Sequence, residues 1–141
     1  MPDTGYNWDA AWTAVPEEDT TDWTAIDITD TNGAQSDPIS NDGKAVTEVS
    51  ILLLEDNTGA CDATGVNIYL LGDINGTTYE DITYGSAWGF KVLAVQNQSV
   101  VARFRVLGSD YSSFRIHLQN ESGQTLTTTM KFRQATIPVA S

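Results

Sequence analysis

The chain has 141 residues, of which 40% are hydrophobic and 9% aromatic, and it carries a formal net charge of −12. This length and apolar content predict one folded domain with its own core and argue against a disordered chain. The negative charge argues against nucleic acid or an anionic membrane as a partner, because the net field of the protein would repel both.

The charge is concentrated in the first half of the chain. Residues 1–65 hold 14 acidic residues and a single basic residue, whereas residues 66–141 hold five acidic and six basic residues. This asymmetry makes contact between an acidic segment and a basic face a hypothesis that the positions of the basic residues can test.

No segment of the sequence predicts export or membrane insertion. The chain begins Met-Pro-Asp-Thr-Gly, without the basic and apolar regions of a secretory signal, and its longest apolar run, residues 51–54, is too short to span a bilayer. A single cysteine, Cys61, excludes an intrachain disulfide and a cysteine-based zinc site. We therefore expect synthesis in a cytoplasm.

Residues 1–23 contain Trp8, Trp12 and Trp23 among acidic residues, threonine and proline, without a helical or strand period. We predict an extended N-terminal arm, residues 1–23, followed by a single β-sandwich domain, residues 24–141. The indoles would anchor the arm either on this chain's own sandwich or on a neighbouring subunit. A further hypothesis is that they form a platform on which sugar rings stack.

Turn and strand signals begin after the arm. Residues 25–28 alternate weakly between apolar and polar side chains, and residues 30–33 and 41–44 carry Asn-Gly and Asp-Gly turn signals. Residues 46–54 are almost continuously apolar, which predicts a strand buried on both faces.

Five later segments alternate between apolar and polar residues with a period of two, which predicts half-buried strands. They are residues 66–71, 88–93, 100–107, 113–119 and 125–133. Because no stretch of ten residues has a helical period, we predict an all-β fold, an antiparallel two-sheet sandwich or jelly roll. The alternation also predicts that Trp88 faces the core and that His117 faces solvent.

The stretch Asp73-Ile74-Asn75-Gly76 permits two interpretations. An acidic residue, an amide and a glycine in this order are typical of a calcium loop, but the first and last ligand positions would fall on Leu71 and Ile82. Asn-Gly between two β-rich segments instead indicates a hairpin with a type I′ turn. We favour the turn, and a looser calcium site in the acidic loops stays open.

Catalytic groups do not form a recognisable pattern. The chain has one histidine, no motif of a nucleophile beside a base, no pair of carboxylates with a distinctive spacing and no metal-ligand spacing. We therefore predict a protein that is not an enzyme and that requires no cofactor or metal.

Five of the seven basic residues lie at outward positions of three predicted strands. They are Arg103, Arg105, Arg115, Lys131 and Arg133. If the three strands share a sheet, these residues line one face. That face is either solvated with weak ion pairs across strands, or covered by acidic segments of the same or another copy.

Several segments together resemble a known class of protein. They are V-T-E-V-S-I at 46–51, V-N-I-Y-L-L-G-D-I-N-G-T-T-Y-E at 66–80, S-A-W-G-F at 86–90, F-R-I-H-L-Q-N-E-S-G at 114–123 and M-K-F-R-Q-A-T-I-P at 130–138. This succession resembles small β-sandwich virion proteins of tailed phages, of the capsid decoration or cement type. Its motifs are turns and strands and include no catalytic residues.

The resemblance implies a structural protein on the capsid surface that binds and stabilises the major capsid protein and associates with copies of itself, often as a trimer. Two alternatives are a carbohydrate-binding module of a tail or fibre, and a tail-tube or tail-tip structural protein. The residues that we expect to make protein contacts are Trp8, Trp12, Trp23, Arg103, Arg105, Arg115, Lys131 and Arg133.

Overall fold

The computed structural model describes residues 5–15, 34–55, 59–61, 64–75, 77–82 and 88–137. Within these ranges every regular element is a β-strand, and no helix that could cross a membrane is found there. The strands are β1 (Asn7–Trp8), β2 (Thr13–Ala14), β3 (Ala34–Gln35), β4 (Ile39–Ser40), β5 (Val46–Leu54), β6 (Val66–Gly72), β7 (Trp88–Val92), β8 (Ser99–Leu107), β9 (Ser113–Asn120) and β10 (Thr127–Thr136).

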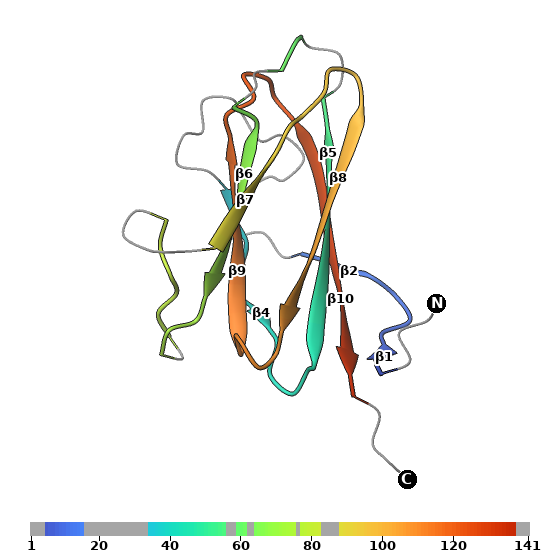
Figure 1. Ribbon diagram of the computed structural model, residues 1–141, viewed down its shortest axis with the longest axis vertical. Coiled ribbons are helices and arrows are strands. Elements are labelled where there is room, and N and C mark those ends of the chain that lie inside the picture. Colours follow the sequence, from blue (N-terminus) through green and yellow to red (C-terminus); the bar gives the residue numbers. More distant parts are fainter. Residues whose placement is uncertain are drawn as a thin grey trace.

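The strands form two antiparallel sheets that lie face to face, and Figure 1 shows both sheets nearly edge-on. In the first sheet β10 lies beside β5 and β5 beside β8, while β1 and β2 both pair with the free edge of β10. In the second sheet β9 lies beside β6 and β6 beside β7, while β3 and β4 both pair with β9. If each short pair counts as one interrupted edge strand, this is the strand order of a jelly roll. The predicted all-β sandwich is confirmed.

The core lies between the two sheets and is built from the inward positions of the alternating strands. Its largest fully buried apolar side chains are Val49, Ile51, Leu53, Val66, Ile68, Phe114, Ile116, Leu118 and Leu126. Removing a side chain of this kind from water contributes about 1.5–3 kcal/mol, so these positions dominate the stability of the fold.

Trp88 is an exception, since it is 50% exposed and not buried as predicted. Its position on β7 does face the other sheet, but β7 is the edge strand of the second sheet. The indole therefore lies at the rim of the sandwich, where it contacts Phe90 and Phe104 with ring centroids 5.3 and 5.9 Å away. Alternation identifies the face of a strand but not whether the strand is at an edge.

The prediction that β5 is buried on both faces is correct for only part of the strand. Its inward side chains are buried, whereas the outward side chains of Ser50, Leu52 and Leu54 are half-buried. Val46 and Glu48 also point outward but are buried. The first half of the outer face is therefore covered, and the second half is partly open to solvent.

The predicted turn at residues 41–44 is present, with Gly43 at a φ of 71° and the Lys44 amide bonded to the Asn41 carbonyl. It carries the chain from the second sheet to the first. The Asn41 side chain is buried at this crossing, where its amide donates to the carbonyls of Val106 and Tyr111.

The described part of the predicted arm, residues 5–15, runs along β10 and completes the edge of the first sheet (Figure 1). The Asp9 amide donates to the Gln134 carbonyl, and the Gln134 amide donates to the Asp9 carboxylate at 3.1 Å. The predicted strand at 25–28, the turn at 30–33, Trp23 and the boundary between residues 23 and 24 lie outside the described residues.

Candidate functional site

Four of the five cations predicted to form a contact face lie together on the outer face of the first sheet. Arg103 and Arg105 project from β8, Lys131 and Arg133 project from β10, and β5 lies between the two strands. We call these four residues the basic face. Arg115 lies on the opposite side of the sandwich, because β9 pairs with β6 in the second sheet. The side of the sandwich on which an arginine lies depends on which strands pair with its own strand, and the alternation of the sequence does not specify that pairing.

The arm covers part of the basic face with two tryptophans. The centroid of the Trp8 ring lies 4.4 Å from Cζ of Arg133 and 5.2 Å from Cζ of Arg105. The centroid of the Trp12 ring lies 4.8 Å from Cζ of Arg133. Each such contact contributes about 0.5–2 kcal/mol, depending on how far it is removed from water. Trp8 and Trp12 therefore contact the sandwich of their own chain.

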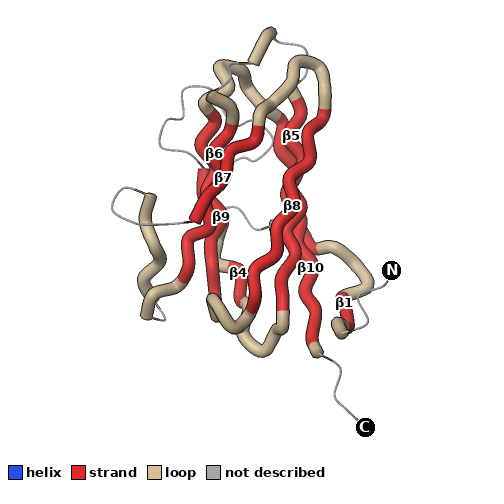
Figure 2. Tube along the Cα trace, in the orientation of Figure 1, coloured by secondary structure: helices blue, strands red, loops and turns tan. Residues whose placement is uncertain are grey.

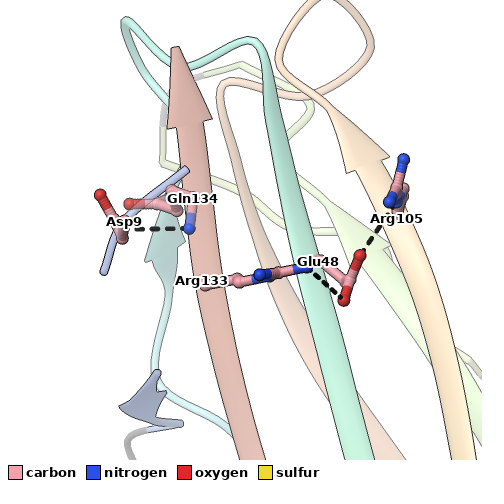
Figure 3. A network of polar contacts seen from close by, with 5 residues as sticks. All are labelled: Asp9, Glu48, Arg105, Arg133 and Gln134. Atoms are coloured by element: carbon pink, nitrogen blue, oxygen red, sulfur yellow. Dashed lines mark hydrogen bonds and ion pairs between the residues drawn. The ribbon is translucent and has the colours of Figure 1, made fainter. Parts of the chain in front are cut away.

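A buried glutamate holds the two covered arginines. Glu48 on β5 is 6% exposed and lies directly opposite Arg105 on one side and Arg133 on the other. Its Oε2 accepts a hydrogen bond from Nε of Arg105 at 3.0 Å, and its Oε1 accepts one from Nη2 of Arg133 at 3.4 Å (Figure 3). Because the Glu48 carboxylate is almost excluded from water, its negative charge must be balanced by the two guanidinium groups. Losing either arginine would leave a buried charge without one of its partners.

The position of Glu48 in the sequence is a signal from which this network could have been predicted. Glu48 is the one charged residue within the apolar strand at 46–54, and a charged side chain is almost never fully buried unless it is paired. Basic residues on two later strands were its available partners.

The other two cations of the basic face are exposed. Within the described part of the chain, Arg103 and Lys131 make neither a hydrogen bond nor an ion pair. They border a shallow depression of about 250 Å3, which Trp12, Leu52 and Ser50 also line. Two positive charges around a partly apolar floor are complementary to an acidic segment of protein.

A larger cleft lies on the outer side of the second sheet, opposite the basic face. Residues 73–75 and 77–82 lie in a loop that projects beside β6 and β9, as Figure 2 shows. A cleft of about 630 Å3 lies between this loop and the sheet. Arg115, His117 and Gln119 of β9 line its sheet side, and Tyr79 lines its loop side.

His117 is buried in this cleft, so the prediction that it faces solvent was wrong. Its position on β9 does point outward, but the side chain is only 6% exposed in the folded chain. Nδ1 of His117 lies 3.3 Å from Oε1 of Gln35 on β3, and the ring lies 6.3 Å from that of Tyr69 on β6.

Glu80 attaches the loop to the body of the sandwich. Its Oε1 accepts a hydrogen bond from the amide of Gly72 at 2.9 Å, and its carboxylate also interacts with the hydroxyl of Tyr111. Burial, followed by the negative charge of Glu80, raises the pKa of Tyr111, which keeps the hydroxyl protonated as a donor. Glu80 thus has a structural role. Across the described ranges, no group of three His, Cys, Asp or Glu side chains could hold a metal ion.

The stretch beginning at Asp73 forms a turn, although not of the predicted type. Asp73 and Tyr79 form an antiparallel bridge, and the Ile74 amide donates to the Thr78 carbonyl at 2.7 Å. A type I′ turn would require a positive φ at Asn75, which this residue lacks. Asn75 instead acts through its side chain, whose Oδ1 accepts a hydrogen bond from the Thr78 amide at 2.8 Å.

The sequence matches no protein-family model and no curated protein. Among solved structures, the coat protein of Tobacco streak virus is 13% identical, with a TM-score of 0.35, over 100% of this chain and 92% of that chain. The dimer of the same coat protein gives 12% identity and a TM-score of 0.38 over the same shares. The CBM22-1 xylan-binding domain from Paenibacillus barcinonensis Xyn10C is 12% identical, with a TM-score of 0.35, over 99% of this chain and 89% of that chain.

Proposed function

We propose that the protein is a non-enzymatic structural protein of a virus particle, a head decoration or cement protein of a tailed phage that binds and stabilises the major capsid shell. The observation that carries this proposal is the exposed half of the basic face. In a chain of net charge −12, Arg103 and Lys131 border a depression whose partly apolar floor suits an acidic protein surface.

The architecture supports a contact role. Jelly rolls recur in viral capsid proteins, and the sequence resembles small phage decoration proteins. The arm is attached to the sandwich through Trp8 and Trp12, so this face is already ordered before a partner binds. Each contact can be small, because apolar burial contributes about 25 cal/mol per Å2 and self-association into trimers would multiply it.

The described side chains favour binding over catalysis. Glu80 is engaged in structural hydrogen bonds, and the one histidine, His117, is buried against Gln35. Their described polar contacts are with Gly72, Tyr111 and Gln35, none of which supplies a serine, threonine or cysteine nucleophile. The protein would therefore act by covering joints between capsid subunits on the outside of the virion, after synthesis in the host cytoplasm.

The test uses purified protein and undecorated shells of the phage that encodes it. Wild-type protein should sediment with the shells and raise their melting temperature. The variant Arg103→Glu with Lys131→Glu should bind at least tenfold more weakly, because two attractive contacts become repulsive. Lys91→Glu, a charge reversal at an exposed position of the second sheet, is the matched control and should bind like wild type.

Two outcomes would contradict the proposal. Unchanged binding by the double variant would remove the basic face from the mechanism. Failure of the wild-type protein to bind shells would exclude head decoration, and localisation of labelled copies on particles by negative-stain microscopy would then show whether the protein belongs to the tail.

A further inference from the structure

The cleft on the second sheet is a well-formed concave site, and the proposed capsid contact does not use it. Its volume of about 630 Å3 lies within the range of about 300–1,000 Å3 that small-molecule sites occupy. It lies on the opposite side of the sandwich from the basic face, so both sites could be occupied in one molecule.

The cleft is lined mainly by groups that both donate and accept hydrogen bonds. Gln35 and Gln119 contribute side-chain amides, and Thr77 and Thr78 contribute hydroxyls from the loop side. All four are half-buried or exposed, so a ligand can reach them. Such groups match the hydroxyls of a ligand, which also donate and accept.

An aromatic ring lines the loop side of the cleft. Tyr79 is held in place, because its hydroxyl lies 2.6 Å from Oγ of Ser113 and the guanidinium of Arg115 lies 5.0 Å from the ring centroid. The ring is half-buried and lines the cleft. A fixed aromatic ring offers apolar surface with little loss of conformational entropy on binding.

A second ring extends the site across the sheet. Tyr69 lies on β6 opposite Gly89 of β7, and a Cβ at position 89 would come within 2.5 Å of Cδ1 of Tyr69. Because Gly89 has no side chain, the ring of Tyr69 on the neighbouring strand can lie against position 89. Beyond it a further hollow of about 260 Å3 is lined by Asn67, Tyr69 and Lys91. Tyr69 also neighbours His117 of the main cleft, with 6.3 Å between the ring centroids, so the two hollows lie side by side on the outer face of the second sheet. We call the two hollows together the groove.

The charges around this groove balance approximately. Arg115 and Lys91 are cationic, whereas Glu80 and Asp81 are anionic. No sign of charge dominates, so the lining favours an uncharged ligand over an acidic one. An elongated groove with two aromatic rings, three amides and two hydroxyls fits a molecule with apolar ring faces and a hydroxyl rim.

We propose that this groove binds a neutral oligosaccharide, with sugar rings on Tyr79 and Tyr69 and sugar hydroxyls bonded to Gln35 and Gln119. The site differs from the tryptophan platform considered from the sequence. Trp8 and Trp12 lie against arginines of their own chain on the other sheet.

The test titrates the full chain with four neutral probes, namely xylohexaose, cellohexaose, maltohexaose and N-acetylchitohexaose, and with hexagalacturonate as an acidic probe. Isothermal calorimetry gives the affinity, and amide chemical shifts locate the site. At least one neutral probe should bind and shift amides of β6, β9 and the loop at 77–82.

Variants then test the named side chains. Tyr69→Ala and Gln119→Ala should each weaken binding at least tenfold, and Tyr69→Phe should retain most of it because the ring remains. Gln98→Ala, at an exposed glutamine between β7 and β8, is the matched amide control and should be unchanged. Circular dichroism of each variant separates loss of binding from loss of folding.

Three results would overturn the proposal. One is the absence of heat and of shift changes with all four neutral probes at millimolar concentration. Another is tighter binding of hexagalacturonate than of any neutral probe, which would make the groove an anion site. The third is a set of shift changes confined to the first sheet.

Discussion

Trp8 and Arg133 come from opposite ends of the sequence, and their side chains stack with 4.4 Å between the ring centroid and Cζ. The pairing of β1 with β10 places them there, since Trp8 lies opposite Ala135 in the register. Arg133 in turn reaches Glu48, and Glu48 reaches Arg105, which also lies beneath Trp8. One layer of alternating aromatic, cationic and anionic groups therefore ties the arm to β10, β5 and β8.

Replacing Trp8 should detach the arm from the sandwich. Trp8→Ala removes the cation–π contacts with Arg105 and Arg133 and part of the apolar area buried by the arm, and we expect the free energy of unfolding to fall by about 2 kcal/mol. Urea denaturation followed by circular dichroism measures this loss. Limited proteolysis should also cut within residues 5–15 sooner than in the wild type.

Trp8→Phe is the control for this prediction. It keeps an aromatic face above the arginines and should lose less than half as much stability. An unchanged stability and an unchanged cleavage rate in Trp8→Ala would show that the stacking seen here does not hold the arm.

Removing the buried carboxylate should be more damaging than removing an exposed one. Glu48→Ala leaves Arg105 and Arg133 close together without a counter-charge, and we expect a loss of about 3 kcal/mol in urea denaturation. Asp42→Ala, at an exposed carboxylate in the turn before β5, should change stability by no more than about 0.5 kcal/mol. If Glu48→Ala and Asp42→Ala lose the same free energy of unfolding, the ion pairs of Glu48 with Arg105 and Arg133 do not stabilise the fold.

A close approach of two backbone segments makes position 108 intolerant of a side chain. A Cβ at Gly108 would lie 1.9 Å from the carbonyl oxygen of Lys44, and the Gly108 amide is bonded to the Ala45 carbonyl at 2.9 Å. Gly108→Ala must therefore displace backbone, at a cost of about 2–3 kcal/mol.

Gly5→Ala provides the comparison, because a Cβ there meets no atom within 4 Å and stability should stay within about 0.5 kcal/mol of wild type. Differential scanning calorimetry of both variants is sufficient. A melting temperature of Gly108→Ala equal to that of Gly5→Ala would contradict the close approach.

Much of the fold could be predicted from the sequence because strand alternation is a local property. Ile68, Phe114 and Ile116 were placed in the core by the period of two, and all three are fully buried. The turn at 41–44 was also predictable from its Asp-Gly pair. The sequence did not predict that this turn joins one sheet to the other, because the pairing of strands into sheets depends on contacts between residues that are distant in sequence.

The candidate site was less predictable for the same reason. Arg115 and Arg133 have equivalent patterns of neighbours in the sequence, yet strand pairing places them on opposite sides of the sandwich. Glu48 and His117 occupy outward positions that would be solvated on a bare sheet. Both are buried in the folded chain, Glu48 between Arg105 and Arg133 and His117 beside Gln35 and Tyr69. Such burial is a tertiary effect that no local period encodes.

The contact between Tyr111 and Glu80 should make stability depend on alkaline pH. Burial and the charge of Glu80 raise the pKa of Tyr111 in the folded state above its unfolded value of about 10. The protonated hydroxyl therefore contributes stability that is fully present below about pH 10 and is lost as the pH rises through the folded pKa.

Tyr111→Phe lacks this hydroxyl and should be less stable than wild type by about 1 kcal/mol at pH 8. Urea denaturation of both proteins at several pH values between 8 and 11 should show the difference narrowing above pH 10, because only the wild type loses the contribution. Tyr6→Phe is the matched control, since the Tyr6 hydroxyl has no hydrogen bond among the described residues, and its curve should stay parallel to that of the wild type. If the difference in the free energy of unfolding between wild type and Tyr111→Phe stays constant up to pH 11, the prediction is wrong. Ionisation of Tyr111 would then not lower the stability in this pH range.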